Sequence, residues 1–211
     1  MRHPWLARLI GRAMALYVRL VAATSRVTGE VTQDPVVLAF WHEYNLVAAA
    51  AAQRRRRHRY HVSFSTQTFR GAVMDAMLAG LDAGSVPLPA PDDRAGSARL
   101  SLELARLGRE GASPGVSPDG PLGPYRRAKP GALLVARESG LPLQPWAVSA
   151  RPSFRLGRRW DRHIVPLPFS RIRVHPAEPI QVPPRVSLRP LLARLQAALD
   201  EVAARADTAG G

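Results

Sequence analysis

The sequence contains no cysteine, only one lysine and few aromatic residues. Without cysteine there is no disulfide-stabilised scaffold, no zinc site built on thiolates and no cysteine nucleophile. Lys129 is the only lysine among 30 basic residues, and the excess of arginine, with much alanine, proline and glycine, is typical of a GC-rich genome. The first residues lack the uninterrupted apolar stretch and small-residue cleavage site of a secretory signal. We find no internal repeat.

The composition is that of a folded domain with a strong positive charge. With 211 residues, 46% hydrophobic and 22% charged, the chain is long enough to bury a core and too apolar for global disorder. The excess of basic over acidic residues gives a formal net charge of +14. This charge favours a polyanionic partner, either a nucleic acid or an anionic bilayer surface. Composition does not choose between them.

Residues 4–27 have the pattern of an amphipathic helix. Apolar residues recur close to a 3.6-residue period, with Arg8, Arg12 and Arg19 on the opposite side. A spanning helix is disfavoured, because each arginine at mid-bilayer costs roughly 2.5–3.5 kcal/mol on insertion scales. We therefore predict that residues 1–27 form a helix lying on the membrane surface, with its aromatic residues at headgroup level. The alternative is a helix packed on its own domain.

The rest of the chain, 28–211, alternates between strand and helix patterns. Strands are expected at 36–41, 60–65, 115–117, 143–149 and 172–175, and helices at 43–53, 71–81, 95–109, 131–139 and 188–205, with a proline-rich loop at 86–91 and a frayed tail from 206. This alternation predicts an α/β fold, with a mainly parallel or mixed sheet flanked by helices. Together with the N-terminal amphipathic helix it forms a single domain overall.

Two residues are candidates for chemistry at the carboxyl ends of strands. His42 follows the apolar run 36–41, and an imidazole there could take a proton from an attacking hydroxyl. Asp119 lies at the apex of the turn 117–124, whose prolines and glycines fix a loop that exposes its backbone. Functional groups of such sheets gather at this edge. The alternatives are a structural histidine and a structural turn.

A cationic cluster follows this turn, and two other clusters lead nowhere specific. Arg126 and Lys129 precede a helix start, where a phosphate would meet both cations and helix-end amides. His58 and His61 lack a third ligand, so no metal site is expected. The arginine run 54–59 could bind RNA or an acidic lipid surface, and no nucleic-acid motif supports the former.

Several motifs in this order resemble the lysophospholipid acyltransferase superfamily. They are Phe40-Trp41-His42, Ser117-Pro118-Asp119-Gly120-Pro121, Ala128-Lys129-Pro130-Gly131 and Trp160-Asp161. Within that superfamily, the chain is most similar to a bacterial branch of uncharacterised proteins. The resemblance covers roughly residues 10–185.

The resemblance implies transfer of an acyl chain from a thioester, on CoA or acyl carrier protein, to a hydroxyl of a glycerol-phosphate-like or lysophospholipid acceptor. His42 matches the catalytic histidine, which would act as the general base. Asp119 and Gly120, flanked by Ser117 and Pro121, match the loop that contacts the acceptor's polar group. Arg126 or Lys129 could neutralise the acceptor's phosphate. Direct attack of this kind needs neither a metal nor a cofactor.

The chain departs from the superfamily pattern in three places. The position five residues after the histidine, usually an aspartate that orients the imidazole, is Val47. An Asp-Gly pair of the bacterial branch corresponds to Arg70-Gly71. Its Arg-Gly-Ser stretch falls near 89–91, with Arg94 the nearest cation and a candidate for binding substrate. Glu43 or Asp75 could supply the missing acid.

The sequence therefore predicts a bacterial, membrane-associated acyltransferase of phospholipid metabolism, cytoplasmic and peripheral on the inner face of the cell membrane. Its partners would be an anionic membrane surface, acyl-CoA or acyl carrier protein, and a lipid acceptor. The first alternative is a lipid-binding protein of the same fold with weak or no activity. The second is a nucleic-acid binder that uses the arginine run, which is the less favoured partner.

Overall fold

The computed structural model describes residues 4–29, 35–54, 60–65, 68–88, 93–120 and 122–210. The helices are α1 (Pro4–Thr24), η1 (His42–Tyr44, a 3₁₀ turn), α2 (Asn45–Arg54), α3 (Phe69–Gly80), α4 (Arg94–Arg109), α5 (Gly131–Ser139) and α6 (Leu188–Gly210). The strands are β1 (Arg26–Thr28), β2 (Val37–Ala39), β3 (Tyr60–Ser65), β4 (Gly84–Pro87), β5 (Ser113–Val116), β6 (Leu143–Arg155) and β7 (Ile164–Pro176).

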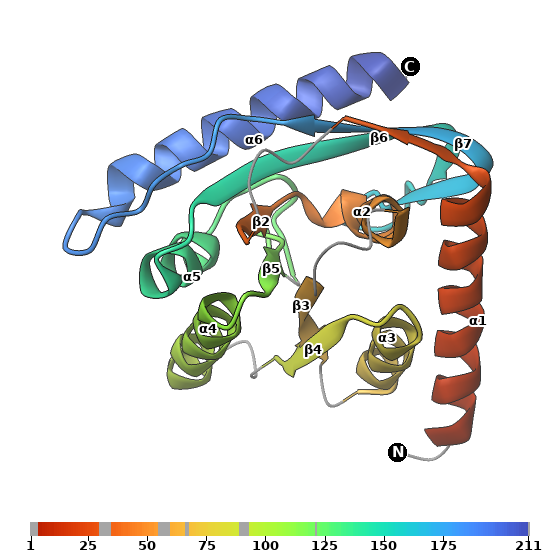
Figure 1. Cartoon of the computed structure of the whole chain (residues 1–211), viewed down its shortest axis with the longest axis horizontal. Helices are drawn as coiled ribbons and strands as arrows, with labels where there is room; N and C mark the ends of the chain where they lie inside the picture. The colour runs from red at the N-terminus through yellow and green to blue at the C-terminus, as the bar shows by residue number, and fades with distance from the viewer. Residues whose placement is uncertain are drawn as a thin grey trace.

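The described strands form one mixed sheet in the order β1-β7-β6-β2-β5-β3-β4. All neighbouring pairs are parallel except β6 and β7, which form an antiparallel hairpin. Helices α4, α5 and α6 lie on one side of the sheet, and α1, α2 and α3 on the other (Figure 1). The predicted α/β fold, with helices on a mainly parallel or mixed sheet, is confirmed.

The centre of the sheet is buried because both of its faces are covered. Residues 36–41 and 113–119 are all buried, as expected for parallel strands between two helical layers. The carboxyl ends of β2 and β5 are neighbours, since Ala39 pairs with Val116. The loops that follow these two strands therefore meet at one edge of the sheet.

Local signals at their ends fix three of the helices. Thr68 accepts a hydrogen bond from the N–H of Gly71 at the start of α3, and Asp93 accepts one from Gly96 at the start of α4. Helix α5 ends at Gly140, whose φ of 76° is the left-handed conformation typical of a helix C-terminus. At its other end, α5 begins at Gly131, directly after the loop that carries Lys129.

Helix α1 packs closely on α3 through a face of small residues. The buried residues of α1 are Ala7, Gly11, Ala15, Val18, Val21 and Ala22. A Cβ placed on Gly11 would lie 2.5 Å from the Cβ of Ala76 in α3, so the two helices approach at a distance that only glycine permits. Within the described residues, no helix has the length and apolar character to cross a bilayer.

The predicted helix 4–27 is wrong at its C-terminal end. It stops at Thr24, and Arg26–Thr28 form β1, which pairs with β7 in register Val27 to Ile172. Arg26 also fits the helical period poorly, which agrees with its place in a strand. Residues 26–28 therefore belong to the sheet.

Four other elements extend beyond the prediction, and the three strands among them do so because tertiary pairing extends them. Residues 84–87, partly assigned to a proline-rich loop, form the edge strand β4. β6 and β7 are longer than predicted since they pair with each other, despite prolines that ordinarily argue against strands. The tail expected to fray from Ala206 is helical to Gly210, and Ala206 is buried.

Candidate active site

His42 and Asp119 meet at the carboxyl edge of the sheet, as their positions predicted. The backbone N–H of His42 donates to Asp119 Oδ1 at 3.1 Å. The imidazole Nδ1 of His42 lies 3.9 Å from the same oxygen. The two residues are 77 positions apart, and the parallel pairing of β2 with β5 brings them together.

Burial sets the protonation of both groups. Asp119 is completely buried, and burial raises the pKa of its carboxyl to about 7. Burial also lowers the pKa of His42 to about 4, although the nearby Asp161 carboxylate acts in the opposite direction. Nδ1 of His42 has no hydrogen-bond partner among the described residues. A neutral imidazole therefore faces a carboxyl group that titrates near neutral pH.

The loop between β5 and α5 brings Gly120 and Lys129 together. A Cβ on Gly120 would lie 3.0 Å from Lys129 Nζ, and the backbone N–H of Lys129 donates to Pro118 O at 2.9 Å. Gly120 has a φ of 62°, which glycine adopts without strain. The Lys129 ammonium is also close enough to His42 to act on its pKa. The only lysine of the chain therefore belongs to this site.

The tip of the β6–β7 hairpin supplies residues to which the motifs had given no role. The Trp160 ring lies 5.4 Å from the His42 ring, and a Cβ on Gly123 would come within 2.9 Å of it. Arg159 holds the buried Asp161 through two bonds of 2.9 and 2.8 Å, and His163 Nδ1 lies 3.6 Å from that carboxylate. The Trp-Asp motif could have indicated Trp160 and Asp161. No pattern in the sequence marks His163.

Glu43, the neighbour of His42, points into a separate ionic network. Its fully buried carboxylate accepts from Arg126 Nε at 2.6 Å, Arg155 at 2.5 Å and the Tyr125 hydroxyl at 3.0 Å. Both arginines also bind Asp207 in α6. Glu43, considered as a replacement for the missing acid, therefore faces these cations. Arg126, predicted to neutralise a phosphate, has its guanidinium engaged by two carboxylates.

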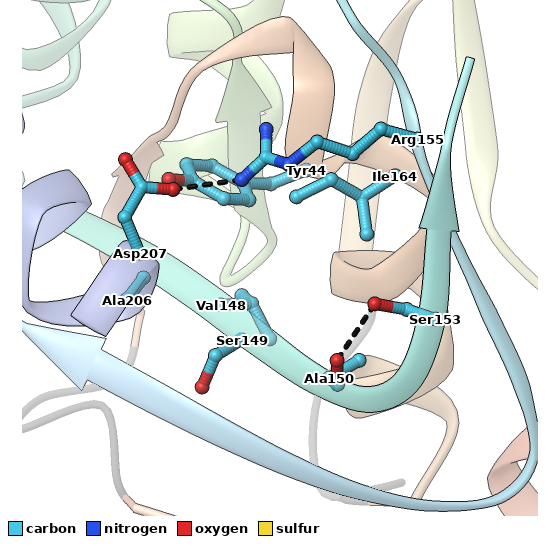
Figure 2. A pocket seen from close by; sticks show the side chains of 9 residues that line it. All are labelled: Tyr44, Val148, Ser149, Ala150, Ser153, Arg155, Ile164, Ala206 and Asp207. Atoms are coloured by element: carbon cyan, nitrogen blue, oxygen red, sulfur yellow. Dashed lines mark hydrogen bonds and ion pairs between the residues drawn. The ribbon is translucent and has the colours of Figure 1, made fainter. Parts of the chain in front are cut away.

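A small cavity lies beside this network and away from His42. Its volume is about 40 Å³, and it is lined by residues of β6, β7 and α6 together with Tyr44. Figure 2 shows the Arg155 side chain extending over Tyr44 toward Asp207 at the cavity wall. A space of this size holds a water molecule or two, not a lipid substrate.

The other predicted positions fall in several surroundings. Ser117 is buried and donates to Asn45 Oδ1 at 3.1 Å, which joins the loop to the start of α2. Val47 lies in the core, and Asp75 is on α3 with its Oδ1 buried. Arg70 is exposed. Pro121, residues 89–91 and residues 55–59 of the arginine run lie outside the described residues, as do His58 and the side chains of His61 and Arg94.

Comparisons with known proteins add little about chemistry. The chain is 27% identical over 150 residues, 71% of its length, to the uncharacterised protein RP090 of Rickettsia prowazekii (strain Madrid E). The match covers 66% of that protein's own length. No family model matches the chain, and no solved structure matches it. The chemistry of this chain is therefore inferred from the residues of the site.

Proposed function

We propose that the protein is a membrane-associated acyltransferase. It would move an acyl chain from acyl-CoA or acyl carrier protein to the hydroxyl of a lysophospholipid-like or glycerol-phosphate-like acceptor. The observation that carries the proposal is the neutral His42 imidazole facing the buried Asp119 carboxyl at the carboxyl edge of the sheet, with Lys129 beside them. The motif resemblance supplies the reaction class.

In the proposed reaction, His42 Nε2 takes the proton from the acceptor hydroxyl as its oxygen attacks the thioester carbonyl carbon. The tetrahedral intermediate collapses, the carbon–sulfur bond breaks, and the thiolate leaves with the proton that His42 had taken. An ester and a thiol are formed, and His42 returns to its neutral state. Lys129 is the cation best placed to meet the acceptor's phosphate, because its Nζ lies beside Gly120 and close enough to His42 to act on its pKa, whereas the Arg126 guanidinium is engaged by Glu43 and Asp207.

Asp119 then has a positioning role, in place of the acceptor contact that the resemblance implied. Its carboxylate lies on the Nδ1 side of His42 and fixes the backbone of the same residue. An Nδ1–H facing this carboxylate leaves the lone pair on Nε2, which is the form a general base needs. Val47 cannot do this, since it is apolar and lies in the core.

Helix α1 supports docking to an anionic membrane surface. Its small residues face the domain, whereas Trp5, Leu9, Leu16 and Leu20 are exposed. Arg8 and Arg12 are exposed next to this apolar stripe, and so is Arg19, which pairs with Asp82 at 3.0 Å. Exposed large apolar residues beside cations fit an in-plane helix at a lipid interface. We propose a peripheral location on the cytoplasmic face of the cell membrane.

One observation favours the alternative of a lipid-binding protein with weak activity. The distance of 3.9 Å between His42 Nδ1 and Asp119 is longer than a hydrogen bond, so no hydrogen bond joins the imidazole to this carboxyl in the structure. Catalytic hydrogen bonds often tighten only in the substrate complex. Measured turnover decides between the two.

The test incubates purified protein with labelled acyl-CoA or acyl carrier protein and total bacterial lipid, and identifies the acylated product by mass spectrometry. We expect transfer by the wild type that His42→Gln abolishes. His175→Gln is the matched control, because His175 bonds Ser149 in the β6–β7 hairpin and has no contact with His42. Transfer that is equal in wild type and His42→Gln would remove His42 as the base.

The membrane proposal is tested by point substitutions and not by truncation, because removing residues 1–27 would also take most of β1 and uncover α3. We expect Leu9→Ser together with Leu16→Ser to lower sedimentation with vesicles containing phosphatidylglycerol. Unchanged sedimentation would contradict the docking role of α1.

A further inference from the structure

Phe169 is an exposed aromatic residue in a conformation that aromatic residues rarely adopt. Its side chain is 77% exposed and its φ is 66°, in the left-handed region that favours glycine. An exposed ring contributes nothing to the core, and a left-handed backbone costs stability. Strain combined with exposure of an apolar ring points to a role outside the fold.

The bend of β7 that carries Phe169 is fastened to the C-terminal half of α1. The backbone N–H of Phe169 donates to Thr24 Oγ1 at 3.1 Å, and the Tyr17 hydroxyl donates to Pro166 O at 2.6 Å. β7 passes the C-terminal end of α1 in Figure 1. These two bonds hold the backbone of the bend that carries Phe169 beside the helix.

Phe169 continues the exposed apolar line of α1. Leu16, Leu20 and Thr24 follow one another at four-residue spacing, so they share one face of the helix. Leu16 is 68% exposed and Leu20 is 50% exposed. Since the backbone N–H of Phe169 bonds to Thr24, Phe169 lies at the end of this line.

The surroundings of this apolar line are mostly cationic, with one acidic residue, Asp82, which pairs with Arg19 at 3.0 Å. Residues 4–29 and 164–176 contain no aspartate or glutamate. On the strands next to Phe169, Arg26, Arg171 and Arg173 are exposed, and Arg26 is the register partner of Arg171. A second copy of the chain docking here through the same patch would place arginine against arginine, since a two-fold interface is self-complementary. An anionic lipid surface complements both the exposed apolar side chains and the arginines.

We propose that Phe169, with Leu16 and Leu20, inserts into an anionic bilayer as a second contact beside the helix stripe. This inference rests on the proposed peripheral association of α1 and adds the bend of β7 to it. Two separate elements anchored in the same plane fix how α1 is rotated about its own axis. They therefore fix the orientation of the sheet edge that carries His42 relative to the lipid.

The lack of cysteine allows a direct test, because a single introduced cysteine can be labelled uniquely. An environment-sensitive fluorophore is placed in the full chain at Phe169→Cys, at Leu9→Cys on the α1 stripe, or at Leu102→Cys as a control. Leu102 is 52% exposed on α4, which lies across the molecule from α1 (Figure 1). The probes are vesicles of phosphatidylcholine with phosphatidylglycerol, and of phosphatidylcholine alone.

We expect the label at 169 to shift to the blue with anionic vesicles and to be quenched by lipids that carry a quencher on the acyl chain. The label at 102 should not respond. If the label at 9 responds and the label at 169 does not, the second contact is wrong and the association of α1 stands. If neither responds, both are wrong. A response at 169 to RNA and not to vesicles would also overturn the inference.

A second variant separates binding from folding. Phe169→Gly suits a φ of 66°, so the free energy of unfolding should stay level or rise. Vesicle partitioning should nevertheless fall about tenfold, as expected when a buried phenyl ring is removed. Leu102→Ser should leave partitioning unchanged. Lower stability with unchanged partitioning would show that Phe169 serves the fold.

Discussion

His42 and Glu43 are adjacent in the sequence, yet their side chains enter opposite kinds of surroundings. Glu43 is fully buried, and its carboxylate accepts hydrogen bonds from two arginines and a tyrosine hydroxyl. His42 is also largely buried, but its Nδ1 has no hydrogen-bond partner among the described residues. One peptide unit thus separates a satisfied ionic network from an incomplete polar pair.

This difference separates stability from chemistry. A buried carboxylate is tolerated only when cations and donors replace its lost water, so Glu43 ties the 3₁₀ turn to the β6–β7 hairpin and α6. An imidazole left without a partner in a buried place costs stability and gains the freedom to exchange a proton. Substitutions at these two positions should therefore separate the loss of rate from the loss of fold.

The largest expected effect is on rate, at His42. Removing a general base lowers turnover by about 10²- to 10⁴-fold, whereas a side chain without a hydrogen bond at its buried nitrogen contributes little to the fold. We expect His42→Gln to lose acyl transfer while its free energy of unfolding changes by less than about 1 kcal/mol. Thiol release from acyl-CoA and urea unfolding measure the two quantities. A large loss of stability in His42→Gln would contradict the expectation that the His42 side chain contributes little to the fold.

The opposite result is expected at Glu43. Glu43→Ala removes the buried carboxylate that Arg126 and Arg155 share, but both arginines keep Asp207 and the Arg155 side chain is 42% exposed. We therefore expect a cost of about 2–3 kcal/mol, below the about 3–5 kcal/mol of a buried charge left without any partner. Urea unfolding measures the cost. The matched control is Glu201→Ala, whose exposed pair with Arg205 at 3.8 Å should contribute less than about 1 kcal/mol. Equal effects of the two substitutions would mean that the network does not stabilise the fold.

Asp119→Asn tests the positioning role and should have a smaller effect. The amide oxygen can still accept the backbone N–H of His42, but the charge facing Nδ1 and part of the bonding to the backbone N–H groups of Asp119 and Arg126 are lost. We expect kcat to fall by roughly 10- to 100-fold with little change in KM, less than the about 10⁴-fold of a tightly bonded triad.

The pH profile distinguishes this role from a structural one. The pKa of Asp119 is raised to about 7, so kcat/KM should rise as pH increases through 7, where the carboxylate forms, and then level off. The pKa of His42 is lowered to about 4, so the imidazole is already neutral over this range. Asp119→Asn should remove the inflection near 7, and Asp161→Asn should keep it. Asp161 does not titrate in this range, because burial, which acts to raise the pKa of its carboxyl, is outweighed by the bonds from Arg159, which lower it. An inflection near 7 that persists in Asp119→Asn would contradict the positioning role of Asp119.

Much of the fold could be predicted because it depends on local pattern. The buried run 36–41 and the helix 131–139 follow directly from composition and from the glycine that ends the helix. The extension of β6 and β7 could not, because prolines at 152, 166 and 168 oppose a strand and only pairing within the hairpin overrides them. The short strand β1 could not be predicted either, since three residues are too few to show a strand period.

The site could be predicted only where one motif carries one group. His42 and Asp119 were placed at strand ends, and the parallel sheet brings those ends together. Arg126 looked like a phosphate ligand because its two partners, Glu43 and Asp207, lie 83 and 81 positions away in the sequence. Pairing over such separations leaves no local signal.

The smallest expected effect on rate concerns the packing of Trp160 beside His42. It is tested by replacing a glycine with alanine at two positions. Gly111 and Gly123 both have positive φ, 89° and 75°, so alanine at either position costs about 1–2 kcal/mol of backbone strain. A Cβ at 111 meets nothing within 4 Å, but a Cβ at 123 would lie 2.9 Å from the Trp160 ring. Gly123→Ala should therefore be less stable than Gly111→Ala in urea unfolding, and only Gly123→Ala should slow acyl transfer, since the displaced ring lies 5.4 Å from that of His42. If both variants keep full activity, the contact with Trp160 does not position the imidazole, and the incomplete pair of His42 and Asp119 is sufficient to hold it.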